Sequence, residues 1–101
     1  MSALFSMHQR FGTFLSSGEA ANAFRFTEVE PVLSRGESIV FDFEGVTNMT
    51  SSFSNALVAT LMAHHPTEFG DLVRFKNCDP VIKCFVSASI SLGRKESKEF
   101  A

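Results

Sequence analysis

The pattern of apolar and polar residues changes along the chain, and each change marks an expected strand or helix. The run from Ser38 to Phe43 is nearly all apolar and lies between two glycines, which is typical of a central strand covered on both faces. A shorter run from Leu72 to Lys76 predicts a second strand. Loose alternation over residues 1–10 predicts an edge strand, and a further short strand is expected over residues 10–15.

Apolar positions at helical spacing separate these expected strands. Ser17 offers an N-cap to the first helix, whose apolar positions continue as far as Gly36. A proline inside a helix removes a hydrogen bond and clashes with the carbonyl four residues earlier, so Pro31 predicts either a kink or a restart at Thr27. The second helix collects its core-facing residues on one face: Phe53, Ala56, Leu57, Thr60, Leu61 and His64.

The third expected helix begins with Asp79 as its N-cap and Pro80 at the first helical position, and Gly93 is placed to cap its C-terminus. Residues 94–101 then form a solvated tail, and residues 1–93 form a single domain. The alternation of strands and helices predicts an α/β fold with right-handed crossovers. We expect a four- or five-stranded mixed, mostly parallel sheet with about three main helices.

Composition and charge narrow the functional classes. The net charge is -2, whereas nucleic-acid-binding surfaces need clustered Lys and Arg, so nucleic acid is not an expected partner. All 12 aromatic residues are Phe, whose ring has no polar group to present to water, so the aromatic content belongs to packing. The two cysteines make no disulfide framework and the N-terminus does not look like a secretory signal, which predicts a reducing, cytoplasmic setting.

Residues 45–67 stand out because these 23 consecutive residues contain no Asp, Glu, Lys or Arg. Polar side chains and Pro66 interrupt the stretch, so it is not expected to span a membrane. Apolar side chains of the second helix extend past its core-facing stripe, and three helices leave little material to cover that helix on every side. We therefore expect an interface, with a regulatory protein or with a second copy in a homodimer. Its residues are Met49, Thr50, Ser51, Ser52, Asn55, Val58 and Met62.

Two short motifs lie where the central strand ends and the second helix begins. Asp42-Phe43-Glu44-Gly45-Val46 follows the strand, and Ser52-Phe53 opens the helix. In these motifs the chain resembles the STAS domain (sulfate transporter and anti-sigma factor antagonist), and more closely the bacterial STAS-like family of unassigned function, over roughly Phe11 to Leu92. The resemblance implies a STAS-like fold and a non-enzymatic, regulatory role in signalling, with a histidine-kinase-like ATPase as the class of partner.

The resemblance also implies a phosphoacceptor. In the anti-sigma factor antagonist branch, a serine at the start of this helix is phosphorylated, and that serine matches Ser52, with Ser51 beside it. Thr50 stands where that branch usually has Asp, and Phe53 stands where it usually has Gly. The structural alternative is that Thr50 or Ser51 caps the helix while Ser52 lies inside its first turn.

Two other functional classes remain open. One is a small-molecule or nucleotide sensor that binds at the N-terminus of the second helix, although residues 45–67 provide no positive side chain to hold a phosphate. The other is a small enzyme that uses His64 or Cys78. Because no paired base or orienting group is visible in the sequence, we do not expect an enzyme.

The remaining candidate residues favour structural roles. His64 and His65 are adjacent, so on a helix they point about 100° apart, and no metal or cofactor site is expected from them. Asp42 follows the apolar part of the central strand, where its carboxylate can accept hydrogen bonds from loop amides. Asp42 and Gly45 are therefore expected to fix the turn after the strand.

Overall fold

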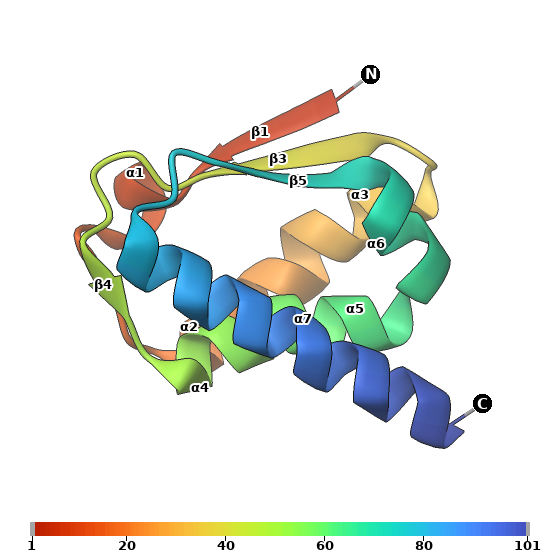
Figure 1. Ribbon diagram of the computed structural model, residues 1–101. Coiled ribbons are helices and arrows are strands. Elements are labelled where there is room, and N and C mark those ends of the chain that lie inside the picture. Colours follow the sequence, from red (N-terminus) through yellow and green to blue (C-terminus); the bar gives the residue numbers. More distant parts are fainter. Residues whose placement is uncertain (1, 101) are drawn as a thin grey trace.

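The computed structural model describes the backbone of residues 2–100 and the side chains of residues 2–97 (Figure 1). In chain order the elements are β1 (Ser2–Ser6), α1 (Met7–Phe11), β2 (Phe14–Leu15), α2 (Gly18–Phe24), η1 (Arg25–Val29), α3 (Glu30–Ser34), β3 (Ser38–Asp42), β4 (Asn48–Met49), α4 (Ser51–Ser54), η2 (Asn55–Ala59), α5 (Thr60–His64), α6 (Pro66–Leu72), β5 (Val73–Lys76) and α7 (Pro80–Phe100). The segments η1 and η2 are π-helical. With their neighbours they form two continuous helices, which we name the first rod (residues 18–34) and the second rod (residues 51–64).

Within the described residues, the main sheet has three parallel strands in the order β1-β3-β5. The strand β3 is central and β5 is its parallel neighbour, as predicted. The expected four or five strands and mixed pairing are wrong, because β2 and β4 have two residues each and pair in parallel with one another instead of joining the main sheet. The architecture is nevertheless the predicted α/β class with three main helices, accompanied by the short α1 and α6.

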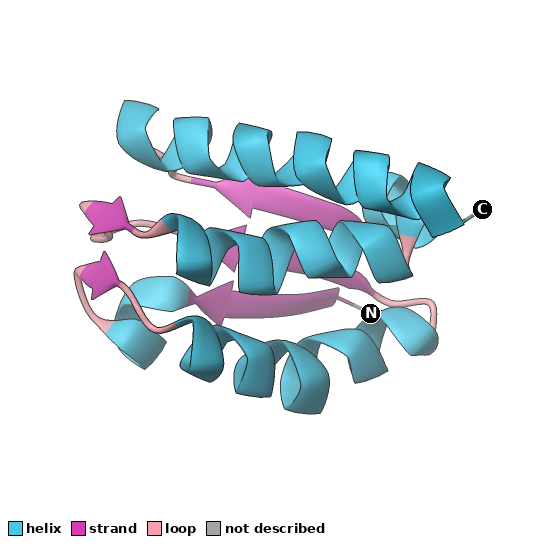
Figure 2. Cartoon of the chain, turned by 90° about the horizontal axis from the view of Figure 1, so that it is seen from below, coloured by secondary structure: helices cyan, strands magenta, loops and turns pink. Residues whose placement is uncertain are grey.

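All the long helices cover the same face of the main sheet (Figures 1 and 2). Ile39 and Phe41 of β3 point into that layer and are fully buried, whereas Val40 lies on the other face and is only partly buried. Leu4, which is paired with Val40 across the sheet, is 63% exposed. The expectation that β3 is covered on both faces is therefore wrong: its unbroken apolar run includes one residue that faces outward.

Phenylalanine rings fill the space between the sheet and the helices. The Phe41 ring stacks against Phe5 and Phe75, with centroids 6.0 Å and 5.6 Å away, and Phe24 meets Phe5 edge-on at 5.1 Å. The predicted apolar face of the second rod lies in the same core through three residues: Phe53, Leu57 and Leu61. The assignment of the aromatic residues to packing is therefore confirmed for these rings.

Pro31 lies inside the first rod and does not restart the helix at Thr27. The π-helical segment η1 immediately precedes the turn that contains Pro31. A π turn inserts one extra residue into the helix, which relieves the clash between a proline ring and an earlier carbonyl. Thr27 serves a different role from the expected N-cap, since its Oγ1 donates to the Ala23 carbonyl at 2.7 Å within the helix.

The last helix is longer than predicted. α7 passes through Gly93 and continues to Phe100, so the expected helix end at Gly93 is wrong, and the residues that follow Gly93 belong to the helix. Gly93 is buried against the second rod, where a Cβ would lie 2.5 Å from the Ala59 carbonyl oxygen and 2.6 Å from Met62 Cβ. This glycine therefore permits close packing of two helices and is not a terminator.

The length of α7 also explains why part of the predicted interface is buried. Met49, Val58 and Met62 are 2%, 1% and 6% exposed, so they are not free to form an interface. The expected interface rests on there being too little chain to cover the second rod. A helix of 21 residues supplies that cover.

Candidate functional site

The pairing of β2 with β4 joins two segments that carry no charge. Phe14 is aligned with Asn48 and Leu15 with Met49. Next to this ladder, Thr47 N donates to the Thr13 carbonyl at 2.9 Å. Residues 11–18 and residues 45–52, both free of Asp, Glu, Lys and Arg, therefore form one surface. We name its exposed part the hydroxyl platform: Thr13, Phe14, Ser16, Ser17, Thr47, Asn48, Ser51 and Ser52.

Both rods begin at this platform. Ser17 caps the first rod by accepting from Ala20 N at 3.1 Å, and Thr50 caps the second by accepting from Phe53 N at 3.2 Å. The Ser17 cap was predicted, and of the two candidates for the second cap the structure selects Thr50. A Cβ on Gly18 would lie 3.1 Å from the Ser52 carbonyl oxygen, so the two helix starts lie in close contact.

The predicted interface residues divide into exposed and covered ones. Ser51 and Ser52 are exposed on the platform, and Thr50 and Asn55 are partly buried. The Asn55 side chain is engaged within the molecule, since its Oδ1 accepts from Ser89 Oγ of α7 at 2.8 Å. Ser89 Oγ also lies 2.6 Å from Ser54 Oγ, and this polar contact ties the second rod to α7.

Phe14 is the large apolar side chain of the platform, and it was not among the predicted interface residues. Its ring is 52% exposed although it is a large apolar side chain. The signal was present in the sequence as the uncharged run over residues 11–18. Only the β2–β4 pairing shows that this run and the longer neutral stretch form one surface.

The turn after β3 is built as expected. Asp42 Oδ1 accepts from Glu44 N at 3.0 Å and from Asn77 Nδ2 at 2.9 Å. The hydrogen bond from Asn77, followed by that from the Glu44 amide, lowers the pKa of the Asp42 carboxyl from its ordinary value. Gly45 has a φ of +88°, and a Cβ there would lie 3.0 Å from the His8 ring, so both backbone conformation and space favour glycine.

An open groove of about 520 Å³ lies beside this turn, at the carboxyl ends of β1 and β3. Its lining consists of Leu4, Ser6, His8, Gln9, Asp42, Glu44 and Gly45. Two of the seven residues are carboxylates, which disfavours a phosphate-bearing ligand. The groove does not include the start of the second rod, so it adds no support for ligand binding there.

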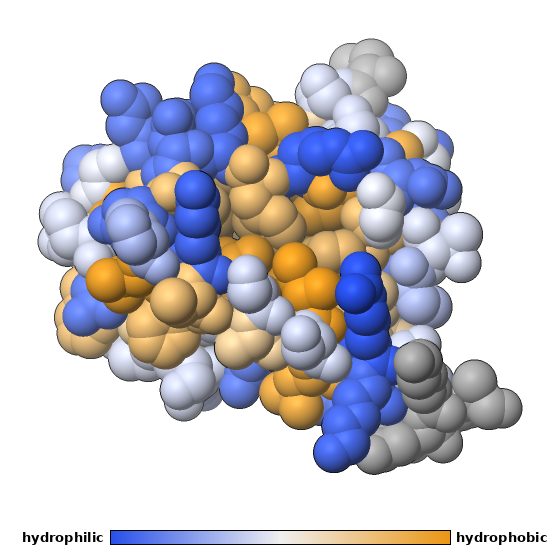
Figure 3. All heavy atoms as spheres, viewed as in Figure 1, coloured by the Kyte–Doolittle hydropathy of each residue, from blue (hydrophilic) through white to orange (hydrophobic). Residues whose placement is uncertain are grey.

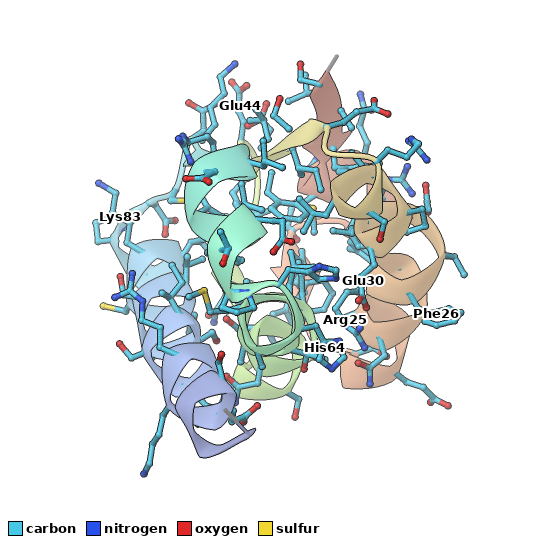
Figure 4. All side chains as sticks on the ribbon, turned by 90° about the vertical axis from the view of Figure 1, so that its right-hand side faces the viewer. Arg25, Phe26, Glu30, Glu44, His64 and Lys83 are labelled. Carbon is cyan, nitrogen blue, oxygen red and sulfur yellow. The ribbon has the colours of Figure 1, made fainter. Side chains whose placement is uncertain are left out.

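A charged cluster joins the first rod to the C-terminal part of the second rod, away from the end that begins at the hydroxyl platform (Figure 4). The Arg25 guanidinium is buried, with its Nε donating to the Ala56 carbonyl at 2.9 Å and its Nη1 paired with Glu30. Glu30 Oε1 lies 3.0 Å from His65 Nε2 and 3.4 Å from His64 Nδ1. We name Arg25, Glu30, His64 and His65 the Glu30 clasp.

The electrostatics of the clasp favour an ionised Glu30. Burial would raise the pKa of this carboxyl, but the hydrogen bond with His65 and the positive charge of Arg25 together outweigh burial and lower the pKa below its ordinary value of 4.5. The two adjacent histidines thus share one carboxylate, which the sequence did not indicate. Among the residues that the structure describes, no group of three or more His, Cys, Asp or Glu could hold a metal ion.

No helix of the described chain combines the length and apolar character needed to cross a membrane. No curated protein and no solved structure matches the chain. The family of the STAS-like domain of unknown function (DUF4325) does match, over residues 20–83. That region contains β3, β5, the second rod and most of the first rod. This chain therefore belongs to the STAS-like domain family of unknown function.

Proposed function

We propose that this chain is a non-enzymatic docking module that binds a regulatory protein through the hydroxyl platform. The exposed Phe14 carries the proposal. A single exposed apolar residue is common on protein surfaces. Phe14, however, lies in one of two paired segments, and neither segment contains a charged residue. Docking there would bury an aromatic anchor without removing charged groups from water, which is how the centres of protein interfaces are composed.

The family resemblance supplies the class of partner, a signalling protein such as a histidine-kinase-like ATPase in a bacterial regulatory system. A cytoplasmic setting agrees with the two free thiols, Cys78 and Cys84. Ser52, with Ser51 beside it, is the proposed phosphoacceptor because both are exposed at a helix start. A phosphate there suits the free amides and partial positive charge of the helix N-terminus. The same charge of about -1.5 to -2 would oppose docking of a neutral partner surface.

The experiment measures binding to a purified partner. Proteins captured by the wild-type chain from its native host are identified, purified and titrated against the wild type and against Phe14→Ala and Ser52→Asp. We expect each variant to weaken binding by about tenfold or more, equivalent to about 1.4 kcal/mol. Thr67→Asp is the matched control, because Thr67 is also exposed in the first turn of a helix but lies on α6, away from the platform.

The outcomes separate docking from a general effect of charge. Equal binding by wild type, Phe14→Ala and Ser52→Asp would contradict the proposal. Loss of binding by Thr67→Asp to the same extent as by Ser52→Asp would also contradict it, since the added charge would then act without regard to position. Thermal denaturation of each variant shows whether the fold is retained.

A further inference from the structure

We propose that an extended segment of a partner protein adds to the free edge of β1 and places a Lys or Arg side chain in the groove at the end of that strand. β1 is an outer strand of the main sheet, and among the described residues it pairs only with β3. In an outer strand, the N–H and C=O groups of every second residue face away from the sheet, where another extended chain can pair with them. Such strand addition supplies affinity through the backbone.

The two outer strands of the sheet differ in how they meet solvent. β5 carries two exposed cations, Arg74 and Lys76, and hydrophilic side chains lie along the upper part of the face that β5 crosses (Figure 3). Charged side chains, Lys above all, are a common protection against added strands. β1 contains neither a charged residue nor a proline, and its Leu4 is 63% exposed. The β1 edge is therefore the one suited to an added strand.

The groove defines the chemistry of the segment. Leu4 and Ser6 of β1 line it from the open face of the sheet, together with Asp42, which is in register with Ser6. Glu44 adds a second carboxylate, and neither Lys nor Arg is among the lining residues. Two carboxylates without a lining cation favour a positively charged side chain.

The cations beside this site do not neutralise the groove. The Arg10 guanidinium lies over the Phe5 ring, 5.2 Å from its centroid and thus on the helical side of the sheet, where it pairs with Glu28. Lys76 is in register with Asp42, but it is exposed, and the two form no salt bridge among the described side chains. The groove therefore keeps the negative charge that a basic side chain complements.

The helical layer favours a single segment over a second copy of this chain. In Figure 2 the first rod extends past β1 at the edge of the molecule. Two copies paired antiparallel through β1 would have their helical layers on the same face of the joined sheet, so their first rods would compete for the same space. A single extended segment needs room only beside β1. The occupant is therefore an extended segment of another protein.

The spacing of the lining residues predicts the pattern of that segment. Residues two apart in a strand point to the same face, so one side chain of the segment lies beside Leu4 and the next on that face lies beside Ser6. The first is apolar and covers Leu4. The second is Lys or Arg, which passes over the small Ser6 to Asp42, one strand further on. An apolar and a basic residue two positions apart thus identify the partner segment.

Selection from a library of random peptides against the purified chain, followed by calorimetric titration with the strongest binder, tests the proposal. We expect the selected peptides to carry an apolar and a basic residue two positions apart. Glu44→Lys should raise the peptide dissociation constant about tenfold or more, because it reverses one charge of the groove. Asp71→Lys is the matched control: Asp71 is also exposed but lies on α6, which precedes the opposite end of the sheet, so the dissociation constant should stay unchanged.

Amide hydrogen exchange tests the strand addition itself. Saturating peptide should slow exchange within β1 about tenfold or more, because the added strand bonds its outward N–H groups. The proposal is overturned if the library yields no binder, if the binders lack a basic residue, if Glu44→Lys and Asp71→Lys act alike, or if exchange in β1 is unchanged. Phe14→Ala should leave peptide binding unchanged, so failure here and failure of docking through the hydroxyl platform are recognised independently.

Discussion

At the scale of single residues, Gly93 shows how much one hydrogen atom in place of a methyl group can decide. A Cβ at this position would lie 2.5 Å from the Ala59 carbonyl oxygen, which belongs to the backbone and cannot swing aside. We expect Gly93→Ala to lower the free energy of unfolding by about 1–3 kcal/mol through overpacking, even though alanine favours helices. Urea denaturation measures the difference.

Gly70 provides the control for that substitution. It also lies in a helix, α6, but a Cβ there would meet nothing within 4 Å. Gly70→Ala should therefore leave stability unchanged or raise it by up to about 1 kcal/mol, as helix propensity predicts. An equal change in the free energy of unfolding for Gly93→Ala and Gly70→Ala would contradict the close contact between α7 and the second rod.

At the scale of elements, the Glu30 clasp links the first rod to the end of the second and makes their contact sensitive to pH. The folded-state pKa of Glu30 is lowered, so the unfolded chain binds the proton more readily. The stabilisation is therefore complete above the unfolded pKa of about 4.5 and is lost as the pH falls through the folded value. We expect wild type to lose stability in that acidic window more steeply than Glu30→Gln.

Denaturant titrations of both proteins from neutral to acidic pH make this measurement. Glu28→Gln is a suitable control, since Glu28 also pairs with an arginine, Arg10, but its side chain is 42% exposed. An exposed ion pair contributes little, so Glu28→Gln should follow the wild-type profile. Parallel profiles for wild type and Glu30→Gln would contradict the role of the clasp.

At the scale of the whole molecule, the fold is two layers, with helices on one face of the main sheet and the other face open. Adjacent residues of β3 should therefore respond in opposite ways to the same change. We expect Ile39→Thr to cost about 2–5 kcal/mol, because it removes buried apolar atoms and buries a hydroxyl. Val40→Thr, on the open face, should cost less than about 1 kcal/mol. Chemical denaturation compares the two, and similar costs would mean that both faces are covered.

The sequence alone determined the elements whose signal is local. The strands β3 and β5, the Ser17 cap and the Asp42 turn all follow from runs of a few residues and from nearby hydrogen-bonding groups, and the order of strands and helices predicted that β3 and β5 pair in parallel. These features depend on side-chain period, backbone conformation and hydrogen bonds within a few residues, and such properties are present in the linear order.

Only the tertiary structure decided which faces are covered and which distant groups meet. The apolar run of β3 does not reveal that Val40 lies on the open face of the sheet. A glycine at residue 93 is equally compatible with a helix end and with a close contact between two helices. The hydroxyl platform and the Glu30 clasp each join residues about 34 positions apart. Such contacts depend on how helices stack on the sheet, which is a property of packing and not of local pattern.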